Sequence, residues 1–233
     1  MSAEKIQGCE EWGRHYRAGI GNRYPDENLV RLLSGRYVPL PQSGRALDVG
    51  FGRGSNLVLL AQKGFEAYGL EISQESIDAA ETLAKEAGVK LNLGLLQDTQ
   101  LPYPDAFFDL LVSWGAVYYF GNRTLVAKAL EEFYRVLKPG GALILLVLHP
   151  NSSTSKRLSR DLGDGAHEIE QVSSYDSRKG LKIFYDATSS GWKELLRGYE
   201  SIEEGTIEFD LFVPERRDAW RLFLARKGAQ SGM

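Results

Sequence analysis

The sequence lacks the features that mark several large classes of protein. Its 233 residues include one cysteine, Cys9, which excludes an internal disulfide and a zinc site built from clustered cysteines. The longest apolar run, residues 142–148, is far shorter than the ~18 residues that a membrane-spanning helix needs. Residues 1–10 are polar and carry charges of both signs, unlike a secretory signal. We therefore expect a cytoplasmic protein with no membrane partner.

Neither sign of charge dominates the composition. The chain has 28 Lys and Arg against 31 Asp and Glu, whereas a nucleic-acid-binding protein usually shows a basic excess. Apolar residues make up 43% of the chain, which is ordinary for a globular protein. At about 150 residues per domain, the length allows one domain with appendages. These features predict a single-core protein, a monomer or a homodimer, that acts on a small molecule and not on nucleic acid.

Short apolar segments alternate with amphipathic ones in the first two thirds of the chain. Segments with the spacing of buried strands lie at residues 45–49, 66–70, 89–96, 108–114 and 142–148. Between them, helical spacing begins after the capping residues Ser55, Ser73 and Asn122. Strands that alternate with helices favour right-handed crossovers and a mostly parallel sheet. The sequence therefore predicts an α/β fold with helices on both faces of the sheet.

The flanking segments follow a different pattern. Pro25 predicts the start of a helix that ends at Gly35, and the preceding segment is rich in aromatic residues, including Trp12 and Tyr24. After residue 150 we expect a hairpin of strands 168–175 and 181–186, a helix at 191–197, and strands at 201–212 and 219–226. The predicted organisation is an N-terminal helical lid (1–44), a core (45–149), a substrate cap (150–190) and a closing segment (191–233).

A glycine turn follows the first predicted strand. Gly50, Gly52 and Gly54 would let a ligand approach the backbone at the start of a helix. Dinucleotide-binding proteins have Gly-x-Gly-x-x-Gly or Ala, but position 55 is serine here. Asp48 would repel a pyrophosphate and could receive an ammonium group. The turn therefore favours a ligand other than a dinucleotide.

Carboxylates also stand at the ends of the next two predicted strands. Glu71 lies 21 residues after Gly50 (71 − 50), and Asp98 ends the following strand. Open α/β sheets bind ligands at the carboxyl ends of their strands. A carboxylate at Glu71 could accept both hydroxyls of a ribose, and Asp98 could accept a hydrogen bond from an adenine amino group. Acids at three successive strand ends favour a ligand site over chance placement.

Five segments, taken in order, resemble the class I S-adenosylmethionine-dependent methyltransferases. They are residues 47–54, 68–73, 97–102, 107–114 and 134–141, and residues 220–227 resemble the last strand of that family. The resemblance implies a Rossmann-like sheet of seven strands, one of them antiparallel. It also implies S-adenosylmethionine as cofactor and S-adenosylhomocysteine as product. The cofactor-binding residues that it implies are Tyr16, Asp48, Gly50, Phe51, Gly52, Asn56, Glu71, Ile72, Asp98, Thr99, Ser113 and Trp114.

The resemblance also assigns parts of the cofactor to residues. Gly50 and Gly52 would face its amino-acid part, with Ser113 and Trp114 at the methionine portion. Glu71 would hold the ribose, while Asp98, Ile72 and Thr99 would surround the adenine. Tyr16 or Tyr24 would cover the cofactor. The family usually has a small residue or cysteine at the position of Phe51, so this pocket is expected to be reshaped there.

Methyl transfer from a sulfonium requires chiefly that an acceptor be aligned and water excluded. A general base helps when the acceptor is a hydroxyl or a protonated amine. His149, at the end of the fifth predicted strand, and Tyr119, after the fourth, are the catalytic candidates, and His15 lies in the predicted lid. No cluster has metal-ligand spacing, so no metal is expected. The predicted function is a methyltransferase for a small-molecule oxygen or nitrogen acceptor. The alternatives are a non-catalytic cofactor-binding protein and a nucleotide-cofactor oxidoreductase.

Overall fold

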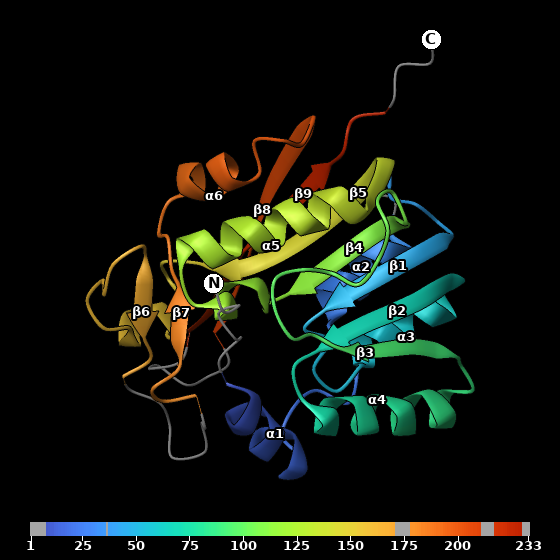
Figure 1. The fold of residues 1–233 in the computed structure, drawn as a ribbon, viewed down its shortest axis with the longest axis horizontal. Coiled ribbons are helices and arrows are strands. Elements are labelled where there is room, and N and C mark those ends of the chain that lie inside the picture. The colour runs from blue at the N-terminus through green and yellow to red at the C-terminus, as the bar shows by residue number, and fades with distance from the viewer. Residues whose placement is uncertain (1–7, 36, 171–177, 211–216, 230–233) are drawn as a thin grey trace.

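A seven-stranded sheet forms the centre of the molecule in the computed structural model, which describes residues 8–35, 37–170, 178–210 and 217–229 (Figure 1). The strand order is β3-β2-β1-β4-β5-β9-β8. Only β9 runs antiparallel to its neighbours, β5 and β8, so the predicted sheet with one antiparallel strand is confirmed. The strands are β1 (Gly44–Val49), β2 (Phe65–Glu71), β3 (Leu91–Leu95), β4 (Phe108–Trp114), β5 (Leu137–Leu148), β8 (Ser201–Asp210) and β9 (Arg217–Arg226).

Helices cover both faces of this sheet, as the alternating pattern predicts. Side chains alternate along β4, so that Leu111 packs with α5 on one face and Leu110 packs with α2 and α3 on the other. Both leucines are fully buried, which explains the continuous apolar run in this strand. The helices are α1 (Cys9–Arg17), α2 (Glu27–Ser34), α3 (Ser55–Gln62), α4 (Gln74–Ala87), α5 (Arg123–Val136) and α6 (Ser189–Leu195), with short 3₁₀ turns η1 (Val117–Phe120) and η2 (Ser155–Arg157).

Capping side chains set where several helices begin. The Ser73 hydroxyl accepts a hydrogen bond from the Ser76 amide, and the Asn122 side chain accepts one from the Leu125 amide, as predicted. The prediction that Pro25 starts a helix is wrong by two residues. α2 begins at Glu27 because the Asp26 carboxylate caps the amide of Asn28. None of the helices in the described ranges is long and apolar enough to cross a membrane.

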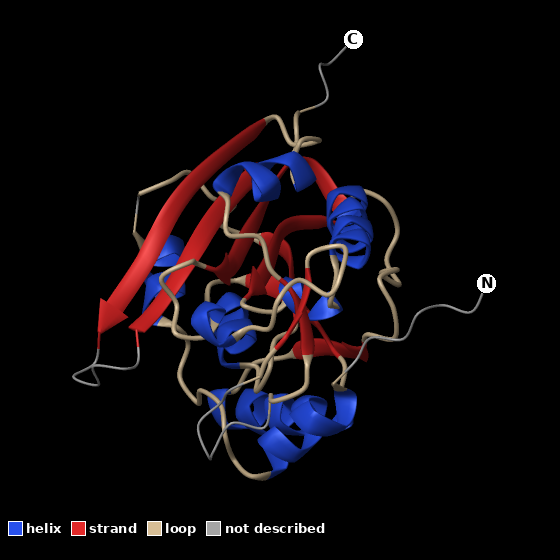
Figure 2. Cartoon of the chain, turned by 90° about the vertical axis from the view of Figure 1, so that its left-hand side faces the viewer, coloured by secondary structure: helices blue, strands red, loops and turns tan. Residues whose placement is uncertain are grey.

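The segment after β5 is less regular than expected. The predicted hairpin is present only as the short antiparallel pair β6 (Ala166–Glu168) and β7 (Lys182–Phe184), which does not join the main sheet. Residues 171–177, including part of the predicted first strand, lie outside the described residues. The two closing strands are confirmed, and Figure 2 shows β8 and β9 as a long two-stranded edge of the sheet.

The carboxylate of Asp109 joins the amino ends of three strands. It accepts a hydrogen bond of 2.8 Å from the Arg45 amide in β1, and both of its oxygens contact the Lys138 ammonium in β5, at 2.9 and 2.7 Å. A side chain at Gly44 would collide with it, since a Cβ there would lie 2.2 Å from an Asp109 oxygen. Asp109 therefore has a structural role. It lies at the edge of the sheet opposite the carboxyl ends of β1 and β2, where Asp48 and Glu71 stand.

We expect Asp109→Asn to lower the free energy of unfolding by about 1 kcal/mol at neutral pH, because it removes a charge-assisted contact but keeps one amide acceptor. Urea denaturation measures this change. The control is Glu27→Gln, which removes the exposed pair with Arg31 on α2 and should have a smaller effect. Equal shifts for both variants would contradict the structural role of Asp109.

Candidate functional site

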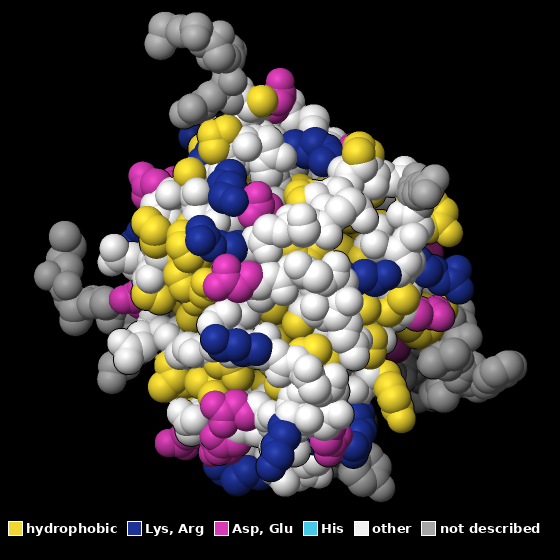
Figure 3. Space-filling view, turned by 90° about the vertical axis from the view of Figure 1, so that its right-hand side faces the viewer, with side chains coloured by type: hydrophobic (Ala, Val, Ile, Leu, Met, Phe, Trp, Pro, Cys, Tyr) yellow, Lys and Arg dark blue, Asp and Glu magenta, His cyan; other side chains and the backbone are white. Residues whose placement is uncertain are grey.

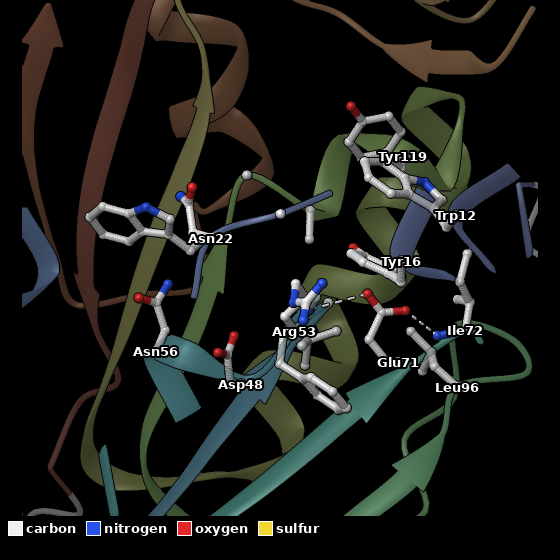
Figure 4. Close-up of a pocket in the computed structure, with 18 of the residues that line it drawn as sticks. Trp12, Tyr16, Asn22, Asp48, Arg53, Asn56, Glu71, Ile72, Leu96 and Tyr119 are labelled. Carbon is white, nitrogen blue, oxygen red and sulfur yellow. Dashed lines mark hydrogen bonds between the residues drawn. The ribbon is translucent and has the colours of Figure 1, made fainter. Parts of the chain in front are cut away.

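A cavity of about 240 Å³ lies at the carboxyl ends of β1, β2 and β4. The glycine turn after β1 forms its floor, and residues of α1 and η1 form its outer wall (Figure 4). Its lining residues are Trp12, His15, Tyr16, Gly21, Asn22, Asp48, Val49, Gly50, Phe51, Gly52, Arg53, Ser55, Asn56, Glu71, Ile72, Leu96, Trp114, Gly115, Ala116, Tyr119 and Phe120.

The glycine turn is tight enough to require glycine. Gly50 has φ +76°, and a Cβ there would lie 2.3 Å from the Cβ of Ala116. At Gly54, with φ +85°, a Cβ would lie 2.6 Å from that of Ala80 on α4. The turn thus packs closely against two neighbouring elements while its cavity side stays bare, so a ligand can reach the backbone.

Asp48 is a buried carboxyl group without a partner. Its side chain is part of the cavity wall, the residue is only 1% exposed, and neither oxygen has a hydrogen-bond partner. Burial raises the pKa of Asp48 to about 8, and the nearby Glu71 carboxyl adds to the increase. An unpaired carboxyl group in this position is suited to a cationic ligand group.

Glu71 is also buried, at 6% exposure, but the backbone holds it in place. Its oxygens accept hydrogen bonds from the amides of Gly52, at 3.2 Å, and Ile72. Burial raises the pKa of Glu71 to about 7, although the amide hydrogen bonds act in the opposite direction. Because each carboxylate oxygen has a second lone pair, the side chain can still accept hydrogen bonds from a ligand in the cavity.

The helix α1 covers the cavity with aromatic side chains. Trp12 stacks on Tyr16, with 5.7 Å between ring centroids, and meets the ring of Tyr119 edge-on at 5.2 Å. The Tyr16 hydroxyl approaches the bare face of Gly52, and burial raises the pKa of that hydroxyl. An ion pair between Arg17 and Glu75 fastens α1 to α4. The aromatic wall is therefore fixed over the glycine turn and Glu71.

Comparison with known proteins shows which family the core of the chain resembles. Residues 47–145 match the family described as "Methyltransferase domain". A protein of Encephalitozoon cuniculi that is provisionally named a methyltransferase is 28% identical over 197 residues, which cover 82% of this chain and 92% of that protein. The S-adenosyl-L-methionine-dependent Diels-Alderase of Talaromyces variabilis is 25% identical over 218 residues, covering 89% and 71%. A SAM-dependent methyltransferase structure from Methanosarcina mazei, at 22% identity, superposes with a TM-score of 0.67 over 85% of this chain and 98% of that one.

The match over residues 47–145 supports the resemblance of the chain to the class I methyltransferases. The cofactor of this family is S-adenosylmethionine, so the cofactor prediction is confirmed at the level of the family. The chemistry of the site agrees with that cofactor, because the buried Asp48 carboxyl group has no partner in the protein and could pair with the ammonium group that S-adenosylmethionine carries. The matched family gives no support to the nucleotide-cofactor oxidoreductase.

The methyltransferase fold brings most of the predicted site residues together around the cavity. The predicted residues that line it are Tyr16, Asp48, Gly50, Phe51, Gly52, Asn56, Glu71, Ile72, Trp114 and Tyr119. Tyr24, the other candidate for covering the cofactor, does not line it and is 78% exposed. The roles assigned to these residues remain predictions, but their proximity in the fold is now explicit.

Four predicted residues, Asp98, Thr99, Ser113 and His149, are not among the lining residues. The Asp98 side chain instead accepts a hydrogen bond of 2.7 Å from the Gln100 amide, and Leu96 takes the place at the cavity wall. The Ser113 hydroxyl is fully buried within β4. Nδ1 of His149 accepts a hydrogen bond of 3.1 Å from the Asn151 amide. The structure thus does not bring these side chains to the cavity.

Several lining residues are absent from the sequence-based prediction. Trp12 lies one helical turn before the predicted Tyr16 on the same helix face, so a helix over residues 9–17 would have pointed to Trp12 as well. Arg53 belongs to the glycine turn itself, but nothing in the sequence shows which way its side chain turns. Nothing in the sequence around Asn22 or Leu96 indicates that these residues line a cavity. In the described ranges, no group of three or more His, Cys, Asp or Glu residues is placed to hold a metal ion.

Proposed function

We propose that this chain binds S-adenosylmethionine in the cavity and transfers its methyl group to an oxygen or nitrogen of a small molecule. The observation that carries the proposal is the unpaired, buried Asp48 carboxyl group beside the bare glycine turn. Asp48 would receive the ammonium group of the cofactor, and Glu71 would accept the ribose hydroxyls. Ile72 and Leu96 supply apolar wall on which the adenine can pack.

The bound cofactor supplies a methyl group already activated by a positive sulfonium. The protein then has to orient the acceptor and exclude water. Trp12, Tyr16 and Tyr119 form the wall that performs both tasks. The Tyr119 hydroxyl accepts a hydrogen bond of 3.3 Å from Arg178, which comes from the segment after β5. This contact supports the proposal that residues 150–190 form a cap over the acceptor, with α1 as the lid.

The acceptor is proposed to be a small molecule and not a nucleic acid. On the face shown in Figure 3, basic and acidic side chains are interspersed and no broad basic patch is visible among the coloured residues. Nucleic-acid binding relies on basic side chains that contact phosphates. A cavity roofed by aromatic rings is suited to a compact acceptor.

Substitution of two histidines, His15 and His149, tests whether a general base assists the methyl transfer. His15 lines the cavity, whereas His149 is not among its lining residues. We expect kcat to fall further in His15→Ala than in His149→Ala, since base catalysis contributes about 10²-fold or more where it operates. Steady-state kinetics of both variants at several pH values measures the effect. A larger loss at His149 would restore the assignment made from the sequence.

A second candidate function is a protein that binds the cofactor without transferring its methyl group. The similarity to a Diels-Alderase that depends on S-adenosyl-L-methionine favours it. The two candidates differ in one observable, the fate of the methyl group.

Incubation with cofactor labelled in its methyl group and a metabolite extract separates them. The proposed methyltransferase should place label on at least one compound, and Asp48→Asn should reduce that labelling when the cofactor is kept below its dissociation constant for the variant. Tight binding of S-adenosylhomocysteine with no labelled compound would favour the non-transferring candidate. No binding of either compound would exclude both.

A further inference from the structure

The part of the cavity lining that comes from α1 and η1 consists entirely of ring-bearing residues, among the residues that the structure describes. They are Trp12, His15, Tyr16, Tyr119 and Phe120, and we call them the aromatic side. The charged residues of the lining, Asp48, Arg53 and Glu71, come instead from the strand ends and the glycine turn, and form the charged side. Figure 4 shows the labelled rings of the aromatic side grouped together, away from Asp48. The two sides of the cavity therefore suit different chemical groups.

Tyr119 lies on the part of the cavity away from the proposed adenine wall. The residues of that wall, Ile72 and Leu96, follow β2 and β3, whereas Tyr119 belongs to η1, which follows β4. In the strand order, β1 separates β4 from β2. The Tyr119 hydroxyl accepts its hydrogen bond of 3.3 Å from Arg178, in the segment proposed as the cap. The Tyr119 ring therefore lines the side of the cavity where an acceptor would meet the cap.

The rings of the aromatic side pack on one another and form a continuous wall. The Trp12 ring stacks on Tyr16 at an interplanar angle of 21° and meets Tyr119 at 89°, with 5.7 and 5.2 Å between centroids. His15 meets the same indole edge-on at 5.3 Å. A cage for a cation needs rings that face a common empty centre, within about 6 Å of the cation. Rings in direct contact leave no such centre between them, whereas a further ring can pack on them edge-on or in an offset stack.

The charged side of the cavity disfavours an anionic acceptor. It holds two carboxyl groups, those of Asp48 and Glu71, against one guanidinium, that of Arg53. A negative group on the acceptor would therefore be repelled more than attracted. An uncharged acceptor avoids this repulsion. It also needs no counter-charge on the aromatic side, where the described lining residues include no Asp, Glu, Lys or Arg.

We propose that the acceptor is an uncharged compound with an aromatic ring, which packs against Tyr119 and Trp12. The inference rests on the proposed function, since it names the substrate class of the same site. An aromatic ring that packs on aromatic rings gains affinity beyond what a saturated ring of the same size gains from burial alone. The Tyr119 ring is therefore a specificity-determining group, and its hydroxyl serves to attach it to the cap through Arg178.

Binding of matched probes to the protein saturated with S-adenosylhomocysteine tests this inference without turnover. The probes 4-methylphenol and 4-methylcyclohexanol differ in whether their ring is aromatic, and benzoate and benzylammonium add a charge of either sign. NMR titration should give 4-methylphenol a dissociation constant about three- to tenfold below those of the other three. Tyr119→Leu should reduce the preference over 4-methylcyclohexanol about threefold and leave the affinity for S-adenosylhomocysteine within about twofold. Tyr119→Phe, which keeps the ring, should retain the preference.

The matched control is Tyr37→Leu, which removes a tyrosine that is 71% exposed and outside the cavity lining, and should leave all these affinities unchanged. The inference would be overturned if 4-methylphenol does not bind, or if any of the other three probes binds as tightly. A marked loss of S-adenosylhomocysteine affinity in Tyr119→Leu would assign the ring to the cofactor and overturn the inference as well. In these cases the proposed function would stand, since the wild type still binds S-adenosylhomocysteine. Failure of the wild type to bind that compound would overturn the inference and the proposed function together.

Discussion

Asp48→Asn is expected to make the ligand-free protein more stable and its cofactor binding much weaker. The substitution replaces a carboxyl group that is 1% exposed and unpaired with a neutral amide of the same shape. The stabilisation at pH 8 should be more than about 1 kcal/mol, because the amide is as buried as the carboxyl group but never carries the charge that burial disfavours. Affinity for S-adenosylhomocysteine should fall about 10- to 100-fold, because the ammonium group loses its counter-charge.

The stabilisation should depend on pH with a defined sign. The pKa of Asp48 is about 8 in the folded protein, above its usual value of 3.8. Between these values the folded protein holds a proton that the unfolded chain has released, so the contribution of Asp48 to the free energy of unfolding falls as pH rises toward 8. Asp48→Asn lacks this contribution. The difference between wild type and variant should therefore grow from pH 5 to pH 8 in favour of the variant.

Ligand binding should show the complementary behaviour. A bound ammonium group favours the ionised carboxylate, so binding below pH 8 should release a proton and the affinity of the wild type should rise with pH. Titration calorimetry in buffers of different ionisation enthalpy measures that release, and urea denaturation measures stability. Asp78→Asn, an exposed change of equal charge on α4, is the control. A variant that binds as tightly as the wild type would remove Asp48 from the site.

Glu71→Gln is expected to weaken cofactor binding about 10- to 100-fold while the protein remains folded. Both oxygens of Glu71 accept hydrogen bonds from backbone amides, and their remaining lone pairs are proposed to accept the ribose hydroxyls. A glutamine has one acceptor oxygen, so its amino group must face a backbone amide or a ribose hydroxyl. Glutamine is a better test than alanine, because alanine would also deprive the Gly52 amide in the glycine turn of its partner.

The readout that isolates the ribose contact uses 5′-methylthioadenosine and its 2′-deoxy counterpart. The wild type should distinguish the two, and Glu71→Gln should distinguish them less. Glu66→Gln, an exposed change at the other end of β2, is the matched control and should bind both as the wild type does. Undiminished discrimination in Glu71→Gln would place the ribose elsewhere.

Both acids lie in surroundings that disfavour their ionised forms. Burial raises the pKa of Asp48 to about 8 and that of Glu71 to about 7, so neither charge is well accommodated before a ligand arrives. The glycine turn and the two strands hold them in place regardless. Such a site gains affinity because its charged groups are already oriented and already poorly solvated.

Local sequence was sufficient to determine the core of the fold and half of the site. Alternation of apolar and amphipathic segments indicated parallel strands, and the glycine turn and Glu71 directly follow strands, so their place at the carboxyl edge follows from chain order. Asp48 lies within a strand beside that turn and shares its location. These positions depend on neighbours close in sequence, which is why pattern alone predicts them.

Tertiary structure alone decided which other side chains reach the cavity. Asp98 is adjacent to a predicted site position, yet its carboxylate turns to the Gln100 amide. Likewise, residue type does not distinguish His149 from His15, yet of these two histidines His15 is the one that lines the cavity. His15 reaches the cavity because α1 packs on α4, through residues some 60 positions apart in the sequence such as Arg17 and Glu75. Side-chain direction and long-range packing arise from the whole assembled core, and no local pattern encodes them.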